Sequence, residues 1–373
     1  MNRFKKYSVL LALFLVLALV ATACGGPAPA PAPDEPDEPA EAVLKVGFVY
    51  PGPVGDYGWN YAHDLGRRYL EDQMPEVEVV VIADVAAGPD AERVMTELVN
   101  DGCDLIFTCS FGFMDFTINV AERFPDVIFM NNSGFRTAEN AGTYYARMYQ
   151  ASYLSGIAAG MQTETGKLGY VAPFPISLAI RQMNAYLLGA RTVNPDITVE
   201  VVWTGSFYDP GVEKESAMSL LDAGCDVIAQ YQDSPAAQQA AQERGVWGIG
   251  AYMDMTQYAP EAVLTGPVWN WGLYYVESVQ SVIAGTWEPH TVYWGGLETG
   301  VVDLAPLNAN VLSQEAIDAV LEARAGVEAG TIDIFAGPLR NDAGEIVVPE
   351  GSTMTDAEKF GMDWFVEGVK SNL

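Results

Sequence analysis

The sequence predicts an α/β protein with two similar lobes, each built on a parallel sheet. From Leu44 onward, apolar runs of strand length alternate with segments of helical periodicity, which is the pattern of parallel strands joined by helices. The runs consist almost continuously of Val, Ile, Leu and aromatic residues, as expected of strands that are covered on both faces. The 373 residues exceed one ordinary domain and are sufficient for two.

The expected strands fall into two consecutive series. The first series lies at residues 46–50, 77–83, 105–108, 127–131 and 144–147. The second series lies at residues 168–172, 199–203, 227–231 and 246–250. Helical patterns separate the strands, for example at residues 60–71 and 91–101, so each series shows the alternation of a parallel α/β lobe.

A short sequence echo links the two series. Residues 100–106 read Asn-Asp-Gly-Cys-Asp-Leu-Ile, and residues 222–228 read Asp-Ala-Gly-Cys-Asp-Val-Ile. In both, Gly stands where a helix is expected to end, and Asp leads into a buried strand. Because ligands of open α/β sheets bind beyond the carboxyl ends of the strands, the expected site is a cleft between the two lobes.

Charge and composition exclude several functions. The formal net charge of −30 leaves no basic face for nucleic acid, so no nucleic-acid partner is expected. An acidic surface of this kind keeps a protein soluble and monomeric. The chain has only two histidines and lacks a phosphate-binding Gly-rich loop, so we expect no metal, no cofactor and no catalytic residue.

Three cysteines lie in the expected folded body. Cys103, Cys109 and Cys225 form no CxxC pair, which argues against a zinc site. An exported compartment permits a disulfide, but the positions of these residues at apolar strand ends favour buried free thiols.

The first 23 residues have the composition of a secretory signal. Basic residues precede an apolar run at residues 9–20, and the small residues 21–23 lead directly to Cys24. A run of about a dozen apolar residues is shorter than the ~20 that a membrane-spanning helix needs. The segment resembles a bacterial lipobox in which Cys24 is lipidated, with Ala21 in place of the usual Leu. An ordinary secreted protein with a chance Cys is the alternative.

Residues 24–43 are rich in Pro, Ala and acidic residues and are expected to form a semi-rigid tether. A tether of this kind lifts a folded body away from a membrane surface. We therefore expect a protein that is lipid-anchored at the cell membrane, with its folded body outside the cytoplasm.

Several motifs resemble one family of binding proteins. Residues 46–50 (VGFVY) and 52–60 (GPVGDYGWN) resemble the opening of the basic membrane protein, or PnrA-like, family of solute-binding lipoproteins. Residues 205–210, 248–250 and 266–272 match further along the chain, so the resemblance extends over essentially everything from Leu44 onward. It implies a type I periplasmic-binding-protein fold with a hinged cleft, and delivery of a bound solute to an ABC permease and ATPase.

The resemblance also implies how the chain divides. One lobe is expected to contain residues 44–147 and 267–296, and the other residues 148–266 and 297–373. The chain is then expected to cross between the lobes near Arg147, Gly266 and Leu297.

The same resemblance implies a set of ligand-binding residues. Trp59 and Phe207 match aromatic residues that sandwich a purine base, an arrangement worth about 1–3 kcal/mol per stacking contact. Asn60 and Asp115 match the polar groups that read the edge of the base, and Asp254 matches a carboxylate that faces the ribose in nucleoside binders.

Each residue also has a purely structural alternative. Trp59 alone would be a core aromatic at a helix start, and Asp115 would more often cap the helix that follows it. Asp233 precedes a helix entry but lies at the carboxyl end of an expected strand, so it is also expected to line the cleft. Trp269 and Trp271 are two residues apart at a helix start, so at most one is expected to face the pocket.

Two departures from the family pattern bear on the ligand. Nucleoside-binding relatives have an Asp just after the first strand, where this chain has residues 50–53 (YPGP), and a Lys where this chain has Trp269. Both missing groups serve the sugar, and an unpartnered buried hydroxyl costs about 1–3 kcal/mol. A free nucleobase such as adenine is therefore expected rather than a nucleoside. A surface sensor for another flat heterocycle and an exported nucleoside hydrolase are the alternatives.

Overall fold

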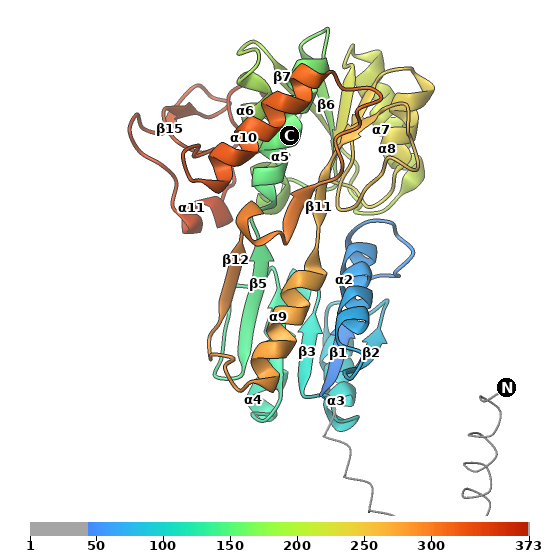
Figure 1. Ribbon diagram of the computed structural model, residues 1–373, viewed down its shortest axis with the longest axis vertical. Coiled ribbons are helices and arrows are strands. Elements are labelled where there is room, and N and C mark those ends of the chain that lie inside the picture. Colours follow the sequence, from blue (N-terminus) through green and yellow to red (C-terminus); the bar gives the residue numbers. More distant parts are fainter. Residues whose placement is uncertain (1–43, 372–373) are drawn as a thin grey trace, which may run out of the picture. The chain divides into compact units, whose positions relative to one another are not determined.

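The computed structural model describes residues 44–371 (Figure 1). The expected signal segment, Cys24 and the tether lie outside the described residues. Within residues 44–371, no helix is both long enough and apolar enough to cross a membrane.

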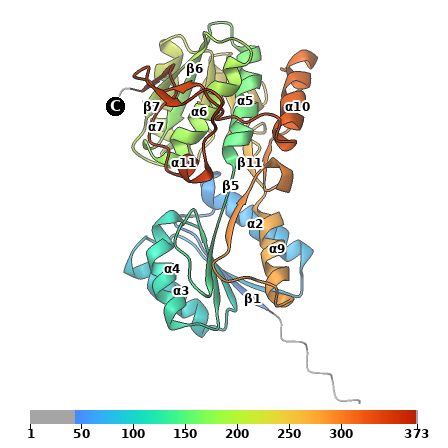
Figure 2. The ribbon, with the colours of Figure 1, turned by 90° about the vertical axis from the view of Figure 1, so that its left-hand side faces the viewer.

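The first lobe is built on a six-stranded sheet in which every neighbouring pair of strands is parallel. In spatial order its strands are β2 (Glu78–Ile82), β1 (Lys45–Val49), β3 (Leu105–Thr108), β4 (Ile128–Asn132), β5 (Ala141–Ala146) and β12 (Val292–Gly295). Its helices are α2 (Trp59–Gln73), α3 (Pro89–Asn100), α4 (Met114–Arg123) and α9 (Trp271–Ile283), with a short 3₁₀ turn η1 (Phe111–Phe113). Figure 2 shows α3 and α4 on one face of this sheet and α2 and α9 on the other.

The second lobe repeats this plan. Its six parallel strands are, in spatial order, β16 (Val369–Ser371), β7 (Thr198–Trp203), β6 (Lys167–Ala172), β8 (Val227–Gln230), β9 (Trp247–Ile249) and β10 (Val263–Thr265). Its helices are α5 (Met148–Gln162), α6 (Ser177–Arg191), α7 (Pro210–Asp222), α8 (Ala236–Glu243) and α10 (Gln314–Glu328). Helices α5 and α6 pack together, as do α7 and α8.

The two lobes share one topology. The order β2-β1-β3-β4-β5 in the first sheet corresponds to β7-β6-β8-β9-β10 in the second. This is the doubly wound order in which the chain reverses direction beside the first strand. The prediction of two similar α/β lobes is confirmed.

The sequence echo has a structural counterpart at the ends of α3 and α7. Gly102 and Gly224 have φ angles of 88° and 89°, in the left-handed region that glycine enters without strain. After each glycine, the N–H of Cys103 or Cys225 donates to the carbonyl of the third-last residue of the preceding helix, Leu98 or Leu220. The strands that follow these two motifs, β3 and β8, occupy the same position in their respective sheets.

The chain passes between the two sheets three times. It leaves the first sheet after β5, returns between β10 and α9, and leaves again after β12. The last two passages are bound together, because β11 (Pro267–Trp269) pairs antiparallel with β13 (Val302–Leu304) beside the turn η2 (Leu297–Thr299).

All nine strands that the sequence analysis expects are present, with ends displaced by a few residues. Other strands were not expected from the sequence, namely the edge strands β10, β12 and β16 and the antiparallel pairs β11–β13 and β14 (Leu339–Arg340)–β15 (Ile346–Val348). These strands have two to four residues, so each contributes only a weak periodic signal.

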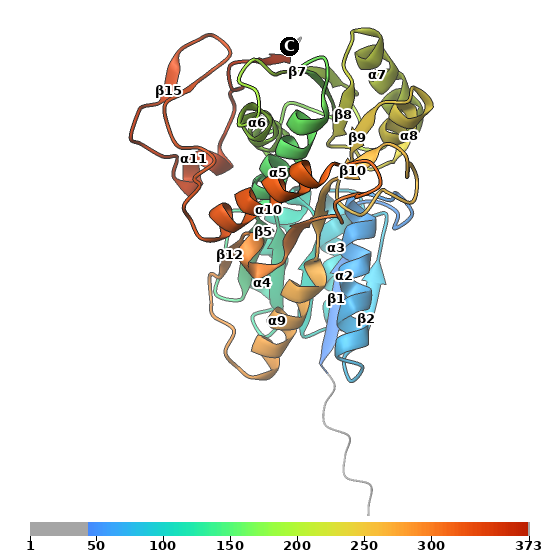
Figure 3. The same ribbon diagram turned by 45° about the horizontal axis from the view of Figure 1, so that its top comes forward.

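The C-terminal segment, residues 329–371, folds over the second lobe and carries β15, the short helix α11 (Asp356–Phe360) and β16 (Figures 1 and 3). Polar side chains on one face of α6 form hydrogen bonds with the backbone of this C-terminal segment. Arg181 Nη1 donates to the Lys359 carbonyl at 2.7 Å, and Ser177 Oγ donates to the Phe360 carbonyl. Asn184 makes two bonds, donating to the Trp364 carbonyl at 2.8 Å and accepting the Val366 N–H at 2.9 Å.

Asn184 offers a test of how firmly this segment is attached. Asn184→Ala leaves two backbone groups without a partner at a fully buried position, so we expect a loss of about 2–4 kcal/mol in the free energy of unfolding. Urea denaturation of the purified protein measures it. Asn194→Ala, at an exposed turn, is the matched control and is expected to cost less than about 1 kcal/mol. Equal losses in the two variants would contradict the assignment.

Candidate ligand-binding site

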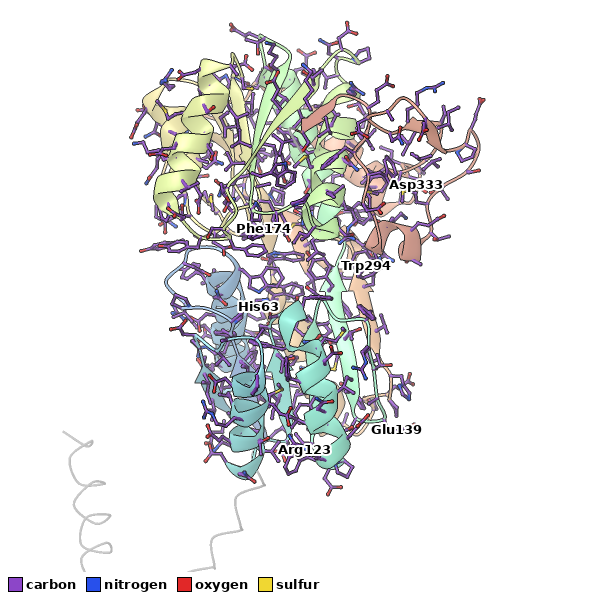
Figure 4. All side chains as sticks on the ribbon, turned by 180° about the vertical axis from the view of Figure 1, so that it is seen from behind. His63, Arg123, Glu139, Phe174, Trp294 and Asp333 are labelled. Atoms are coloured by element: carbon purple, nitrogen blue, oxygen red, sulfur yellow. The ribbon has the colours of Figure 1, made fainter. Side chains whose placement is uncertain are left out.

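The carboxyl edges of the two sheets meet where α2 begins. The N–H of Trp59, the first residue of α2, donates to Asp233 Oδ1 at 3.0 Å, and Asp233 follows β8 of the second lobe. A Cβ atom added at Gly58 would lie only 2.3 Å from the Asp233 Cα, so glycine alone fits this approach. We call this contact between Gly58, Trp59 and Asp233 the lobe junction. In Figure 4, His63 lies in the first lobe and Phe174 in the second lobe, on either side of the lobe junction.

A second carboxylate, Asp56, organises the start of α2 from within the first lobe. It is buried and accepts the backbone N–H groups of Gly58, Asn60 and Tyr61 at 3.0 Å each. It also accepts the Asn60 side-chain amide at 2.6 Å, while Asn60 Oδ1 accepts the Gly52 N–H. Through these hydrogen bonds, the Asn60 side chain holds the loop that precedes α2.

Asp233 is nearly as buried as Asp56 but has a less complete set of donors. Burial raises the pKa of its carboxyl group well above the usual value, and the nearby charge of Asp56 adds to the effect. The Trp59 N–H partly offsets the shift because it stabilises the carboxylate. The hydroxyl of Ser234, the residue after Asp233, donates to the Glu213 carboxyl group. Burial also raises the pKa of Glu213.

The indole of Trp59 is partly exposed and packs into a cluster of aromatic rings. Its Nε1–H donates to the Cys109 carbonyl at 2.8 Å, which fixes the plane of the ring. The ring centroid lies 4.8 Å from that of His63 and 6.2 Å from those of both Trp269 and Tyr252, each in edge-to-face geometry. Trp59 therefore forms part of an aromatic wall that contains residues from both sides of the lobe junction.

Trp269 and Trp271 do not both lie at the helix start that the sequence predicts, because only Trp271 belongs to α9. Their rings stack with centroids 4.5 Å apart and planes 16° apart, and both side chains are buried. The expectation assumed that both residues are helical, but Trp269 ends β11 and Asn270 has non-helical backbone angles. Residues two apart in extended backbone point to the same side, so the two indoles can stack.

His63 is buried at the base of this wall. Its imidazole stacks on Trp271 at 5.1 Å, and its Nδ1 lies 2.5 Å from the Tyr275 hydroxyl. Burial lowers the pKa of His63 to about 3, so the ring is neutral at physiological pH. Its position in the core of the first lobe gives it a packing role.

Phe207 reaches the junction through its backbone. Its carbonyl accepts the Asp233 N–H at 3.0 Å, and its side chain is 43% exposed. Its ring lies 5.5 Å from that of Phe174, a residue that the sequence analysis did not identify. The structure thus brings Trp59, Asn60, Asp233, Phe207 and Trp269 together around the lobe junction.

Two predicted residues lie apart from this group. Asp115 is exposed in the first turn of α4, where its side chain makes no capping hydrogen bond and pairs with Arg136 Nη1 at 2.5 Å. The carboxylate of Asp254 is exposed and accepts the Thr256 N–H at 2.9 Å. Among the described residues, no hydrogen bond or ion pair joins either carboxylate to Trp59, Phe207 or Asp233.

Backbone geometry marks two further residues that sequence reasoning missed. Tyr57 and Tyr252 have φ angles of 60° and 66°, an unfavourable region for aromatic residues, and such conformations cluster at functional sites. Tyr57 lies in the loop before α2 with its ring 5.5 Å from that of Tyr258, and Tyr252 packs against Trp59. Neither feature has a signal in the sequence.

A small cavity of about 10 Å³ lies behind Tyr252 in the second lobe, lined in part by Ser152, Gln182, Tyr186 and Gln230. It has room for about one water molecule and cannot hold a heterocycle.

The three cysteines of the folded body are buried and free, as the sequence analysis expects. Burial raises the pKa of Cys103 to about 11 and that of Cys109 and Cys225 to about 12. Their thiols remain protonated at physiological pH and act as small apolar side chains.

Comparison with known proteins identifies relatives of this fold. Residues 43–327 match the family described as PnrA-like ABC transporter substrate-binding proteins. A purine-binding protein of Brucella abortus is 38% identical over 335 residues, which cover 90% of this chain and 95% of that protein. A protein of Haloferax volcanii with the provisional name of ABC transporter glucose-binding protein is 39% identical over 331 residues, which cover 88% of this chain and 81% of that protein.

A solved structure agrees with the fold. An ABC transporter solute-binding protein from Aeropyrum pernix superimposes with a TM-score of 0.69 at 21% identity, covering 79% of this chain and 94% of that one. The fold is that of the type I periplasmic binding proteins, as the family resemblance implies. The chain belongs to the PnrA-like family of ABC transporter substrate-binding proteins, which bind a solute and catalyse no reaction.

Proposed function

We propose that this protein is the substrate-binding lipoprotein of an ABC importer for a purine-type solute, and that a free nucleobase such as adenine binds more tightly than its nucleoside. The observation that carries the proposal is the aromatic lobe junction, where Trp59 and Phe207 flank the buried Asp233. The purine-binding relative supports the ligand class. The permease and ATPase of the importer are the partners, and the folded body acts as a monomer.

Each site residue has a proposed role. Trp59 and Phe207 supply stacking rings, and Asn60 and Asp115 read the edge of the base. Asp233, which follows β8 and accepts the Trp59 N–H, contacts the ligand from the second lobe, and Asp254 matches a carboxylate that faces the sugar in nucleoside binders. The lobes are proposed to contain residues 44–147 with 267–296 and residues 148–266 with 297–373.

The preference for a free base rests on Trp269. Its indole is buried against Trp59, Tyr145 and Trp271, and its Nε1–H has no hydrogen-bond partner among the described residues. An indole at this position takes the place of the lysine that serves the sugar in nucleoside-binding relatives. A ribose would leave hydroxyl groups against apolar rings, which is unfavourable.

The ligand is proposed to act by stabilising the closed arrangement. A solute that contacts both lobes binds the closed state better than the open state, so it shifts the population toward closure. The junction between Gly58 and Asp233 forms only when the lobes are closed, because its atoms come from opposite lobes.

Substitution at Gly58 tests this closure. Gly58→Ala places a methyl group against the Asp233 backbone, so we expect weaker ligand binding by at least about tenfold and a larger radius of gyration in the presence of ligand. Calorimetry and small-angle scattering measure the two effects. Gly55→Ala is the matched control, because a Cβ atom there meets nothing within 4 Å. Unchanged affinity and compaction in Gly58→Ala would show that closure does not use this contact.

A ligand panel tests the proposed solute class. Calorimetry with adenine, hypoxanthine, adenosine, ribose and glucose is expected to give the tightest binding for a free base, with adenosine weaker by more than about tenfold. Tighter binding of adenosine than adenine would refute the free-base preference and leave the purine class intact. Binding of glucose or ribose without any base would refute the purine class, an outcome made relevant by the name of the Haloferax relative.

The lipid anchor is proposed from the sequence of residues 1–24. Cys24→Ser removes the thiol that receives the lipid, so we expect the precursor to remain uncleaved or the folded body to leave the membrane fraction. Immunoblotting of fractionated cells measures this. A Cys24→Ser protein of mature size that still sediments with membranes would show that Cys24 is not the anchor.

A further inference from the structure

Exposed phenylalanines are confined to one region of each lobe. Of the phenylalanines that the structure describes, only four are exposed, namely Phe111 (54%), Phe135 (71%), Phe174 (38%) and Phe207 (43%). Each follows a strand by two to four residues, these strands being β3, β4, β6 and β7. All four therefore lie at the carboxyl edges of the sheets, and these are the edges that meet at the lobe junction.

The four rings form one pair in each lobe. Phe111 and Phe135 have ring centroids 6.3 Å apart, and their strands β3 and β4 are neighbours in the first sheet. Phe174 and Phe207 have centroids 5.5 Å apart, and their strands β6 and β7 are neighbours in the second sheet. We call these two pairs the first-lobe and second-lobe Phe pairs.

Hydrogen bonds hold the loops of the first-lobe pair in place. Asn131 Nδ2, near the end of β4, donates at 2.9 Å to the carbonyl of Ser110, the residue before Phe111. The Phe135 N–H points to the Met114 sulfur at 3.3 Å, and Met114 is buried at the start of α4. The exposed rings of this lobe thus project from a supported backbone.

The loops of the second-lobe pair are tied to each other through their backbones. The Thr204 N–H donates to the Ala172 carbonyl and the Gly205 N–H to the Pro173 carbonyl, each at 2.9 Å. These bonds join the chain that leads into Phe174 to the chain that leads into Phe207. In both lobes, therefore, a rigid scaffold presents two aromatic rings to solvent, which favours a binding role over a packing role.

A charged pair stands beside the first-lobe rings. Arg136 follows Phe135 directly, and its guanidinium pairs at 2.5 Å with Asp115, which follows Met114 in the first turn of α4. The Arg136 side chain is 45% exposed and that of Asp115 63%, so the guanidinium keeps further N–H donors and the carboxylate keeps a further acceptor available. Such a pair complements a ring edge that carries a donor and an acceptor side by side.

We propose that the two Phe pairs are the stacking faces for the planar ring of the ligand, one on each lobe, and that Arg136 together with Asp115 reads its edge. This inference rests on the proposed function and extends it to Phe111, Phe135, Phe174 and Arg136. The ligand class is a planar heterocycle with a neighbouring donor and acceptor on one edge, as in adenine and hypoxanthine. Trp59, bonded to the Cys109 carbonyl two residues before Phe111, continues the first-lobe face toward the junction.

Alanine variants of the three new aromatic residues test the stacking faces. Phe111→Ala, Phe135→Ala and Phe174→Ala are each expected to weaken adenine binding about 5- to 100-fold in calorimetry, the range that loss of a stacked aromatic ring gives. The matching Leu variants keep an apolar side chain without a π-face and are expected to recover only part of the affinity. Leu321→Ala is the control, because Leu321 is also an exposed apolar residue but lies on α10.

Arg136→Gln tests the edge contact. It is expected to weaken both adenine and hypoxanthine about tenfold or more, because a charge-assisted donor is lost. Arg93→Gln removes an exposed, ion-paired arginine on α3 and is expected to leave both affinities unchanged. Thermal unfolding of every variant is expected to match the wild type, since the altered side chains are exposed.

The outcomes separate the two proposals. If the wild type binds adenine and all four variants bind it equally well, the Phe pairs and Arg136 are not part of the site, although the proposed function stands. If only the Trp59→Ala and Phe207→Ala variants lose affinity, the ligand lies closer to the junction and this inference is overturned. If the wild type binds neither adenine nor hypoxanthine, the proposed function fails, and the ligand class assigned here fails with it.

Discussion

The arrangement of the binding region depends on one contact, the approach of the Asp233 carboxylate to the N-terminus of α2. The first N–H groups of a helix have no partner within the helix and carry a partial positive charge, so they favour an anionic group. Asp56 satisfies several of them from the first lobe, and Asp233 satisfies the Trp59 N–H from the second. The helix that opens the first lobe is thus held at its start by carboxylates from both lobes.

This contact explains two other features of the region. Asp233 can approach only because Gly58 has no side chain, so a single glycine permits this contact between the lobes. The same approach buries Asp233 near Asp56, and the resulting desolvation and repulsion raise the pKa of Asp233. The contact therefore places Asp233 where its ionised form is disfavoured.

The internal duplication provides the frame, and the differences between the halves provide the asymmetry. Both lobes have the same order of their first five strands, but the first sheet gains β12 at one edge and the second gains β16 at the opposite edge. The C-terminal segment that carries β16 begins beyond the residues that match the family and packs on α6. Arg181 of α6 is fully buried there over the rings of Trp294 and Phe360, so this segment and a strand of the first lobe share one guanidinium.

The fold class, the two-lobed plan and nine of the strands could be predicted from the amino-acid sequence, because they rest on local hydrophobic runs and on a Gly-Cys-Asp motif that each half carries. The resemblance of its motifs to the family pointed to Trp59 and Phe207, and the place of Asp233 after a buried strand pointed to that residue, because residues that follow parallel strands gather at one edge of the sheet. Only the tertiary structure showed that Asn60 is bound to Asp56, that Trp269 stacks on Trp271, and that Asp115 pairs with Arg136. The Phe pairs were equally hidden, because their members are 24 and 33 residues apart and become neighbours only through strand pairing. The local sequence pattern predicts which residues form a helix or strand. The partner of a side chain depends on how elements that are far apart in the sequence pack together, and a local pattern does not encode that packing.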